Sequence, residues 1–437
     1  MRRRNAVAAV AAGGLLLVAS VAGFASAQQD RQTTEAAAAE QAAVVDPLTA
    51  AIAAAQTRLE TVPGDYTTWA QLGSAYVEQA RVTADPSYYD LADGALAQSL
   101  TLRPDANDAA LTGQGALANA RHDFAAARDA ADAALAINPY SATAWGVLTD
   151  ARTQLGDYPG ATEALDRMLE LRPGLASFTR ASYDAELHGD LANARSALEQ
   201  ALETATGDPA SEAFCRTYLG QLALNQGDLD EAGAQFSAGL VDLPDDASLL
   251  LGRARVDAAR GNEDAAVAGF QRVVDSSPLP EHFVEFGEYL ESLGRDDEAQ
   301  QQFALVDTVR QLFAAGGVTD DLSAALFAAD HGDPATALTA AQAEYDRRVN
   351  IDSQDALAWA LHAAGRDAEA LPLAQQATSL GGASALFLYH RGAIEAGLGM
   401  TDQARATLTQ ALDTNPYFSP LLAPRATELL ESLGGPA

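Results

Sequence analysis

A unit of about 34 residues recurs along most of this chain, and this repetition constrains the fold more than any other feature. Its clearest copy runs from Tyr140 to Pro173. Apolar residues at helical spacing predict one helix over 142–155, Gly156 predicts a break, and a second apolar stripe predicts another helix over 159–171. Because one such pair cannot bury both its faces, neighbouring copies must stack to build a core.

Glycines at a regular interval mark the copies. They are spaced 33 to 38 residues apart, and each is followed by an alanine of the predicted second helix. The interval predicts about ten repeats, in an array that the weaker pattern around residues 314–317 divides into parts over 46–313 and 314–433. The weak stretch predicts a hinge or an irregular junction. The repeating glycines are Gly156, Gly189, Gly227, Gly261, Gly294, Gly332, Gly365 and Gly399.

The repeat resembles the tetratricopeptide repeat (TPR) family. Trp69, Leu72, Gly73 and Tyr76 follow the W-x2-L-G-x2-Y spacing of that family, and the 140–173 unit has its length. The resemblance implies an all-α, right-handed superhelical solenoid of TPR-like repeats. It also implies that the first helix of each pair lines a concave groove that holds a peptide or a partner helix.

The first 27 residues have the organisation of a secretory signal. Three arginines precede an uncharged apolar run, and Ala25-Ser26-Ala27 is an A-x-A cleavage pattern. We expect a cleaved signal peptide over 1–27, with an uncleaved N-terminal membrane anchor as the alternative, and an Ala/Gln-rich spacer over 28–45. The chain is therefore expected to be exported, either secreted or held at the outer face of the cytoplasmic membrane.

Two local features modify the array. The stretch Arg81–Asp90 makes the first full repeat about seven residues longer, which predicts a lengthened turn between its two helices. Residues 417–433 predict a closing helix that covers the last apolar face, since a solenoid needs a cap at its end.

The charge is strongly acidic. The 437 residues carry 60 carboxylates and 27 arginines with no lysine, for a net charge of −33. Such a field opposes binding to nucleic acid or an anionic membrane and favours basic partners or cations. Solubility in an exported setting explains the same charge without any ligand.

The search for catalytic chemistry finds little. No two of the six histidines lie at i, i+3 or i, i+4, and the sequence has no P-loop, G-x-S-x-G or C-x-x-C motif. His122, His188 and His331 lie beside predicted turns, where solvated side chains are expected. Cys215 is expected to be a core residue. Pairs such as Asp245-Asp246 stand where helices begin, which favours capping. We therefore expect no enzyme, no cofactor and no metal site.

What remains is a binding surface. Tyr183, Phe214, Gln221 and Arg255 are predicted to lie on the groove face of repeats four to six, and residues of these types often anchor interfaces. The absence of lysine argues against the lysine-containing clamp by which some TPR proteins hold a C-terminal carboxylate. The sequence therefore favours a non-catalytic scaffold or adaptor for a protein or peptide. A small-ligand or cation-binding protein is the alternative, and a purely structural spacer is a third.

Overall fold

The computed structural model describes residues 47–382 and 384–436, and this part of the chain is entirely helical or irregular, with 22 α-helices and no strand. Residues 51–437 form one compact unit. The preceding unit, residues 1–50, is described only over 47–50, the first turn of α2. The expected signal peptide or anchor (1–27) and the spacer (28–45) lie outside the described residues.

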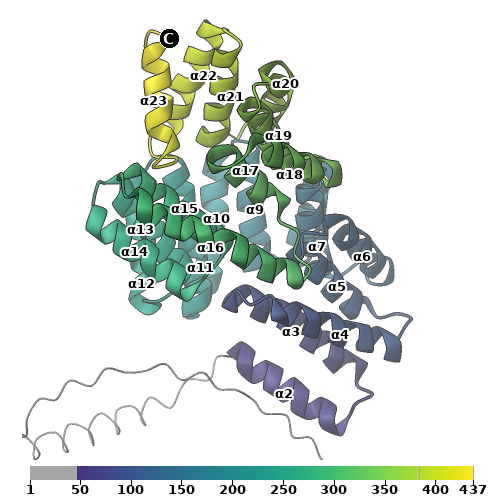
Figure 1. The fold of residues 1–437 in the computed structure, drawn as a ribbon. Helices are drawn as coiled ribbons and strands as arrows, with labels where there is room; N and C mark the ends of the chain where they lie inside the picture. Colours follow the sequence, from purple (N-terminus) through teal and green to yellow (C-terminus); the bar gives the residue numbers. More distant parts are fainter. Residues whose placement is uncertain (1–46, 383, 437) are drawn as a thin grey trace, which may run out of the picture. The chain divides into compact units, whose positions relative to one another are not determined.

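The helices follow one another as antiparallel pairs, each packed on the next (Figure 1). The array opens with α2 (Pro47–Thr61) and closes with α23 (Leu422–Ser432). The first helices of the ten pairs between them are α3 (Tyr66–Thr83), α5 (Asp108–Ala120), α7 (Ala142–Gln154), α9 (Leu175–Leu187), α11 (Pro209–Asn225), α13 (Ala247–Ala259), α15 (Pro280–Ser292), α17 (Asp321–His331), α19 (Ile351–Ala363) and α21 (Ala385–Gly397). The second helices are α4 (Ser87–Leu102), α6 (Phe124–Ile137), α8 (Tyr158–Leu171), α10 (Leu191–Ala205), α12 (Leu229–Asp242), α14 (Glu263–Ser276), α16 (Asp296–Ala315), α18 (Pro334–Arg347), α20 (Asp367–Ala377) and α22 (Thr401–Thr414). The predicted all-α repeat array is confirmed.

Gly-Asp dipeptides stand in the turn inside four of the ten pairs, and at residues 156–157 the two residues have separate tasks. Gly156 follows the end of α7 with φ +78°, a left-handed conformation that lets the chain reverse. The next residue, Asp157, then caps α8, because its carboxylate accepts a hydrogen bond from the backbone N–H of Gly160 at 3.1 Å. The paired carboxylates expected to cap helices do so as well: Asp246 accepts from the N–H of Leu249 at 2.9 Å.

The predicted long turn at 81–90 is wrong. The extra residues instead lengthen α3, which has 18 residues where α5 and α7 have 13, and only 84–86 separate α3 from α4. The segment after Tyr76 contains no glycine or proline until Pro86, so nothing stops the helix earlier. The extra residues of the two 38-residue intervals, Gly189–Gly227 and Gly294–Gly332, likewise lengthen a helix. Helix α11 has 17 residues and α16 has 20.

The core consists of several apolar clusters, each formed between neighbouring helices of the array. Phe236, Phe270 and Phe303 occupy the same position of three successive second helices, four residues after a fully buried alanine, and are at most 9% exposed. Gly220 and Gly252 both face Phe236 so closely that a Cβ on either would lie within 2.5 Å of its ring. The expected closing helix is present but begins at Leu422, and it packs against α21 and α22.

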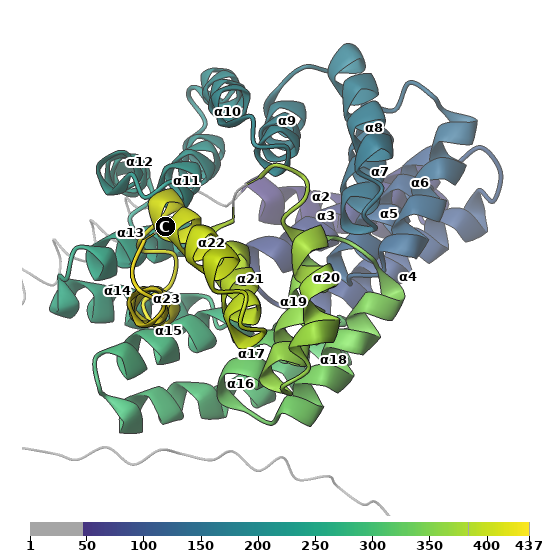
Figure 2. The ribbon, with the colours of Figure 1, turned by 90° about the horizontal axis from the view of Figure 1, so that it is seen from above.

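The superhelix closes on itself after about six helix pairs. Hydrogen bonds join residues 191 to 197 positions apart: Asn350 Nδ2 donates to Gln154 O, Gly382 N to Leu187 O, and Asn415 Nδ2 to Leu224 O. The ends of α7 and α9 thereby meet the residues just before α19 and α21, and the end of α11 meets the C-terminal end of α22. Figure 2 shows α19 to α23 lying over the arc of the earlier helices.

The irregular stretch expected near 314–317 lies at one of these contacts. Helix α16 continues through Ala315, and residues 316–320 form the connection to α17. Arg121 Nε donates to Gly316 O at 3.1 Å, and Thr319 N donates to Arg121 O at 3.3 Å. The connection is therefore tied to the turn between α5 and α6. None of the helices in the described residues is long and apolar enough to span a membrane.

Candidate functional site

A cavity of about 640 Å³ lies on the inner side of the array, and we call it the groove cavity. Its walls come from the first helices α11, α13, α15 and α17 with part of α14, and from α21 and the segment 415–424. This size is typical of sites for drug-sized ligands or a few peptide side chains. The C-terminal segment thus covers part of the surface that the first helices present.

Two of the four residues predicted for a site, Gln221 and Arg255, line this cavity and contact each other. Arg255 Nη1 donates to Gln221 Oε1 at 2.9 Å. The same guanidinium makes a two-pronged ion pair with Glu285, with Nε–Oε1 and Nη2–Oε2 distances of 2.6 and 2.7 Å. Gln221 Nε2 in turn donates to Asn225 Oδ1, and Asn225 Nδ2 to Glu186 Oε1, at 2.7 and 2.9 Å. A polar chain therefore crosses the inner faces of α9, α11, α13 and α15.

The other two predicted residues, Tyr183 and Phe214, do not line the groove cavity. Phe214 lies on α11 two helical turns before Gln221 and packs edge-to-face on Tyr218, with ring centroids 4.8 Å apart. Tyr183 lies on α9, and its side chain is recessed enough that burial raises the pKa of its phenol, although 44% of the residue is exposed. The structure therefore does not bring the four residues to one centre.

Beside the groove cavity, which Glu288 lines, a buried pair contradicts one sequence expectation. His331 is not a solvated turn residue: its side chain is only 9% exposed, and Nε2 lies 3.0 Å from Glu288 Oε1. It packs between Phe303 and Phe327, which the turn-based argument did not anticipate. Desolvation lowers the pKa of His331, but the hydrogen bond and charge of Glu288 outweigh it, so the pKa is raised overall. Burial raises the pKa of Glu288 despite His331. His122 and His188 are exposed, as expected.

A second buried group reaches the cavity from the later repeats. His390 Nδ1 lies 2.8 Å from Asp355 Oδ2, and both residues are 1% exposed. The imidazole stacks on Trp359 at a centroid distance of 4.1 Å, and Trp359 Nε1 donates to Asp330 Oδ1 at 2.9 Å. These residues come from α17, α19 and α21, so no spacing within one helix could have revealed them. The only signal was a carboxylate, Asp355, directly before the apolar run of residues 356–361 in α19.

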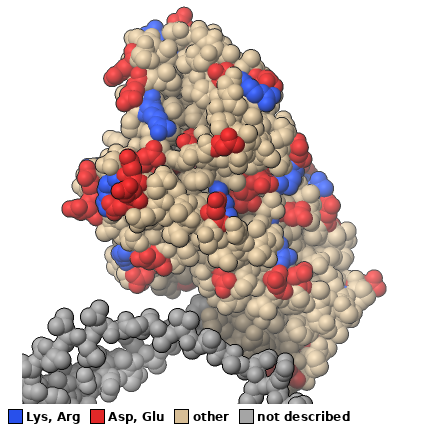
Figure 3. All heavy atoms as spheres, in the orientation of Figure 1, with Lys and Arg blue, Asp and Glu red and all other residues tan. Residues whose placement is uncertain are grey.

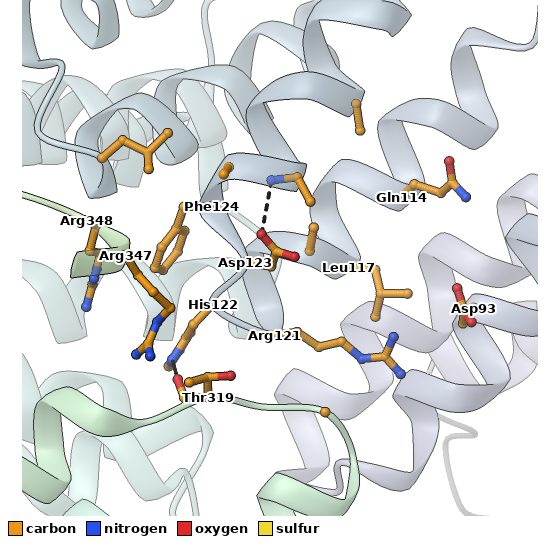
Figure 4. A pocket seen from close by; sticks show the side chains of 16 residues that line it. Asp93, Gln114, Leu117, Arg121, His122, Asp123, Phe124, Thr319, Arg347 and Arg348 are labelled. Carbon is orange, nitrogen blue, oxygen red and sulfur yellow. Dashed lines mark hydrogen bonds between the residues drawn. The ribbon is translucent and has the colours of Figure 1, made fainter. Parts of the chain in front are cut away.

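A second cavity of about 600 Å³ lies where two turns of the superhelix meet (Figure 4). His122 Nδ1 lies 2.9 Å from Thr319 O, and the Arg348 guanidinium carbon lies 4.7 Å from the centre of the Phe124 ring. Arg348 also forms an ion pair with Glu344 and a hydrogen bond with Gln154. These contacts join the two turns, which accounts for the arginines here without a ligand.

Acidic side chains outnumber basic ones by 60 to 27 along the sequence. Figure 3 shows carboxylates distributed over one face, with most arginines beside them. Among the described residues no group of three or more His, Cys, Asp or Glu side chains is arranged to hold a metal ion. Cys215 is fully buried, as expected.

Comparison with known proteins gives similarity in fold only. Neither a family model nor a curated protein matches this sequence. A solved tetratricopeptide repeat protein from Parabacteroides merdae is 19% identical, with a TM-score of 0.35, over 59% of this chain and 97% of that one. YrrB, described as a TPR protein with an unusual peptide-binding site, is 19% identical with a TM-score of 0.29, over 42% and 92% of the two chains. The human IFIT1 dimer with m7Gppp-AAAA is 14% identical with a TM-score of 0.48, over 76% and 77%. The paired helices described above give this chain the all-helical repeat fold of TPR-like arrays, as the sequence predicts.

Proposed function

We propose that the chain is an exported, non-catalytic scaffold that binds a segment of a protein or peptide in the groove cavity. The observation that carries this proposal is the cavity itself, a space of about 640 Å³ bounded by four successive first helices and a C-terminal segment. Repeat arrays present such extended inner surfaces to their partners. The cavity walls combine apolar side chains with a few oriented polar groups, the composition typical of binding sites.

Export is the second part of the proposal and rests on residues 1–27 alone. The full chain, with a C-terminal tag, is expressed in a bacterium, and the mass of the protein outside the cytoplasm is measured. We expect a mature chain that begins at Gln28, held at the outer face of the cytoplasmic membrane or secreted. A chain retained in the cytoplasm with residues 1–27 intact would contradict export.

Photo-crosslinking in cells tests groove binding. Tyr417 lines the cavity and is 44% exposed, so benzoylphenylalanine replaces one aromatic side chain with another there. Tyr140 is 76% exposed, does not line the cavity, and is the matched control. We expect a discrete protein adduct from position 417 that is absent from position 140. Equal labelling from both positions would contradict the proposal.

The alternative is a site for a small organic ligand, since a cavity of this volume also fits one. A small ligand predicts that position 417 forms no protein adduct and that a purified, co-eluting small molecule raises the melting temperature.

A further inference from the structure

Two buried polar atoms without hydrogen-bond partners belong to residues that line the groove cavity. They are His390 Nε2 and the Tyr289 hydroxyl, in residues that are 1% and 3% exposed. Buried polar groups in folded proteins are nearly always paired, because an unpaired one loses its hydration without compensation. No protein group pairs with these two atoms, so an atom of a molecule bound in the cavity can do so.

The contacts of His390 fix what that ligand atom must be. Nδ1 faces the Asp355 carboxylate, and Asp355 does not line the cavity, so Nε2 is the ring nitrogen left for it. A carboxylate at Nδ1 holds the proton on that nitrogen, which makes Nε2 of the neutral ring an acceptor. The ring is held by this contact and by stacking on Trp359 at an interplanar angle of 13°. The partner that completes Nε2 of the neutral ring is therefore a hydrogen-bond donor.

The charge around the cavity indicates a cationic donor. Five carboxylates line it against one guanidinium, Arg255, which is already paired with Glu285. Asp330 is close to His390, since both contact Trp359, one at the indole nitrogen and one at the ring face. Aromatic rings complete the wall, and their faces attract cations. The five carboxylates are Glu263, Glu281, Glu285, Glu288 and Asp330, and the aromatic residues are Phe270, Tyr289, Phe327, Tyr417 and Phe418.

We propose that the groove cavity receives an arginine or lysine side chain of a basic, otherwise apolar segment of the partner protein, and that His390 Nε2 accepts an N–H from it. This inference rests on the groove-binding function proposed above and specifies the chemistry of the partner. A peptide source is favoured over a free amine because the apolar residues Leu326, Phe418 and Pro420 extend the lining beyond the charged groups, as apolar residues flanking the cation would require. The net charge of −33 adds long-range attraction for a basic segment.

Binding of short capped peptides to the full mature chain tests the proposal. Four five-residue probes are compared by fluorescence anisotropy. Each has two leucines on each side of a central arginine, lysine, glutamine or glutamate. We expect the arginine or lysine probe to bind about tenfold or more tightly than the glutamine probe, as a charge-assisted hydrogen bond requires. Equal binding of the arginine, lysine and glutamine probes would overturn the proposal.

Variants locate the effect. Asp330→Asn keeps an oxygen for Trp359 Nε1 and removes one charge, so we expect affinity for the arginine probe to fall about tenfold. Asp132→Asn removes the same charge from an exposed position on α6 outside the cavity and should leave affinity unchanged. His390→Phe removes the acceptor and keeps a ring on Trp359, but it leaves Asp355 without its partner. If the His390→Phe variant fails to fold, Asp330→Asn is the decisive variant. Equal effects of the two aspartate changes would contradict a local site.

The remaining comparisons separate this inference from the proposed function. If position 417 captures a protein whose crosslinked segment has no basic residue, the cationic recognition is wrong while groove binding stands. If agmatine displaces the arginine probe at equal concentration, the site takes a free organic cation, and the peptide source is wrong.

Discussion

At the scale of single residues, packing within one helix pair and against the next depends on glycines that leave room for one large ring. The nearest Phe236 atoms would lie 2.5 Å from a Cβ at Gly220 and 2.3 Å from one at Gly252. Phe236 is 1% exposed and surrounded by core, so it has nowhere to move. The first helices α11 and α13 can approach the second helix α12 only because both positions lack a side chain.

Replacing Gly220 by alanine is therefore expected to lower the free energy of unfolding by about 1–3 kcal/mol through overpacking. Gly94, in the middle of α4, has open space around its Cα, and alanine there should raise stability by about 0.5–1 kcal/mol. Urea denaturation of both variants measures the contrast. Equal effects of the two substitutions would show that the approach of α11 to Phe236 is not tight.

His122 occupies the position at which most other repeats have glycine, with φ +62°. Both His122→Ala and His122→Gly lose the contacts with Thr319 and Phe124, but only glycine relieves the left-handed backbone. The glycine variant should therefore be about 1 kcal/mol more stable than the alanine variant. An alanine variant as stable as the glycine variant in urea would argue that this turn changes conformation when the side chain is removed.

Burial raises the pKa of the Cys215 thiol to about 11 from an ordinary value of 9.0. At pH 8 the thiolate fraction should be about a hundredfold lower in the folded chain than in urea, and iodoacetamide labelling correspondingly slower. Since the folded pKa is the higher one, the stability contributed by the neutral thiol is present below pH 9 and is lost between about pH 9 and 11. Rapid labelling of the native chain at pH 8 would contradict this.

At the scale of helices and turns, the glycines that end first helices divide into two classes. A Cβ on Gly156 would lie 2.0 Å from the carbonyl oxygen of Val349 in the next turn of the superhelix. Gly365 has nearly the same backbone, φ +72°, but nothing within 4 Å. The two turns are alike within their repeats and differ only in what stacks on them.

The matched pair Gly156→Ala and Gly365→Ala tests whether the turns of the superhelix contact each other. Both variants place alanine in a left-handed conformation, which costs about 1 kcal/mol. Gly156→Ala must in addition displace the start of α19, so it should cost at least about 1 kcal/mol more than Gly365→Ala. Equal urea midpoints would indicate that the turn after α7 and the start of α19 are apart in solution.

At the scale of the whole molecule, the dominant feature is an excess of carboxylates held in one compact unit. Most arginines form ion pairs, and many of these are exposed pairs that contribute little each. Unpaired carboxylates then repel one another over distances that salt screens, since the Debye length falls from about 30 Å at 0.01 M to about 3 Å at 1 M.

The melting temperature should therefore rise when NaCl is increased from about 0.01 M to about 0.5 M, where screening is nearly complete. Repulsion of like charges is weakened more than the short ion pairs. Scanning calorimetry at constant pH measures the shift. A melting temperature that falls with salt would mean that the ion pairs outweigh the repulsion.

Local sequence determined the repeat. Glycine is needed where the chain reverses with positive φ, aspartate caps the helix that follows, and apolar spacing sets which faces pack, so the paired helices, the closing helix and the buried Cys215 could all be predicted. The sequence also contains the reason why α3 is long, since no helix breaker stands between Tyr76 and Pro86. The predicted long turn did not take this absence into account.

Only the tertiary structure decided how repeats far apart in the chain meet. Contacts between residues 191 to 197 positions apart arise from small rotations accumulated over six helix pairs, and no local pattern encodes their sum. The same closure brings His390, which contacts Asp355 and Trp359, to the cavity that Gln221 and Arg255 line from the earlier repeats. The sequence could predict Gln221 and Arg255 as binding residues from their side chains. Which residues of later repeats lie opposite them depends on the geometry of the whole superhelix.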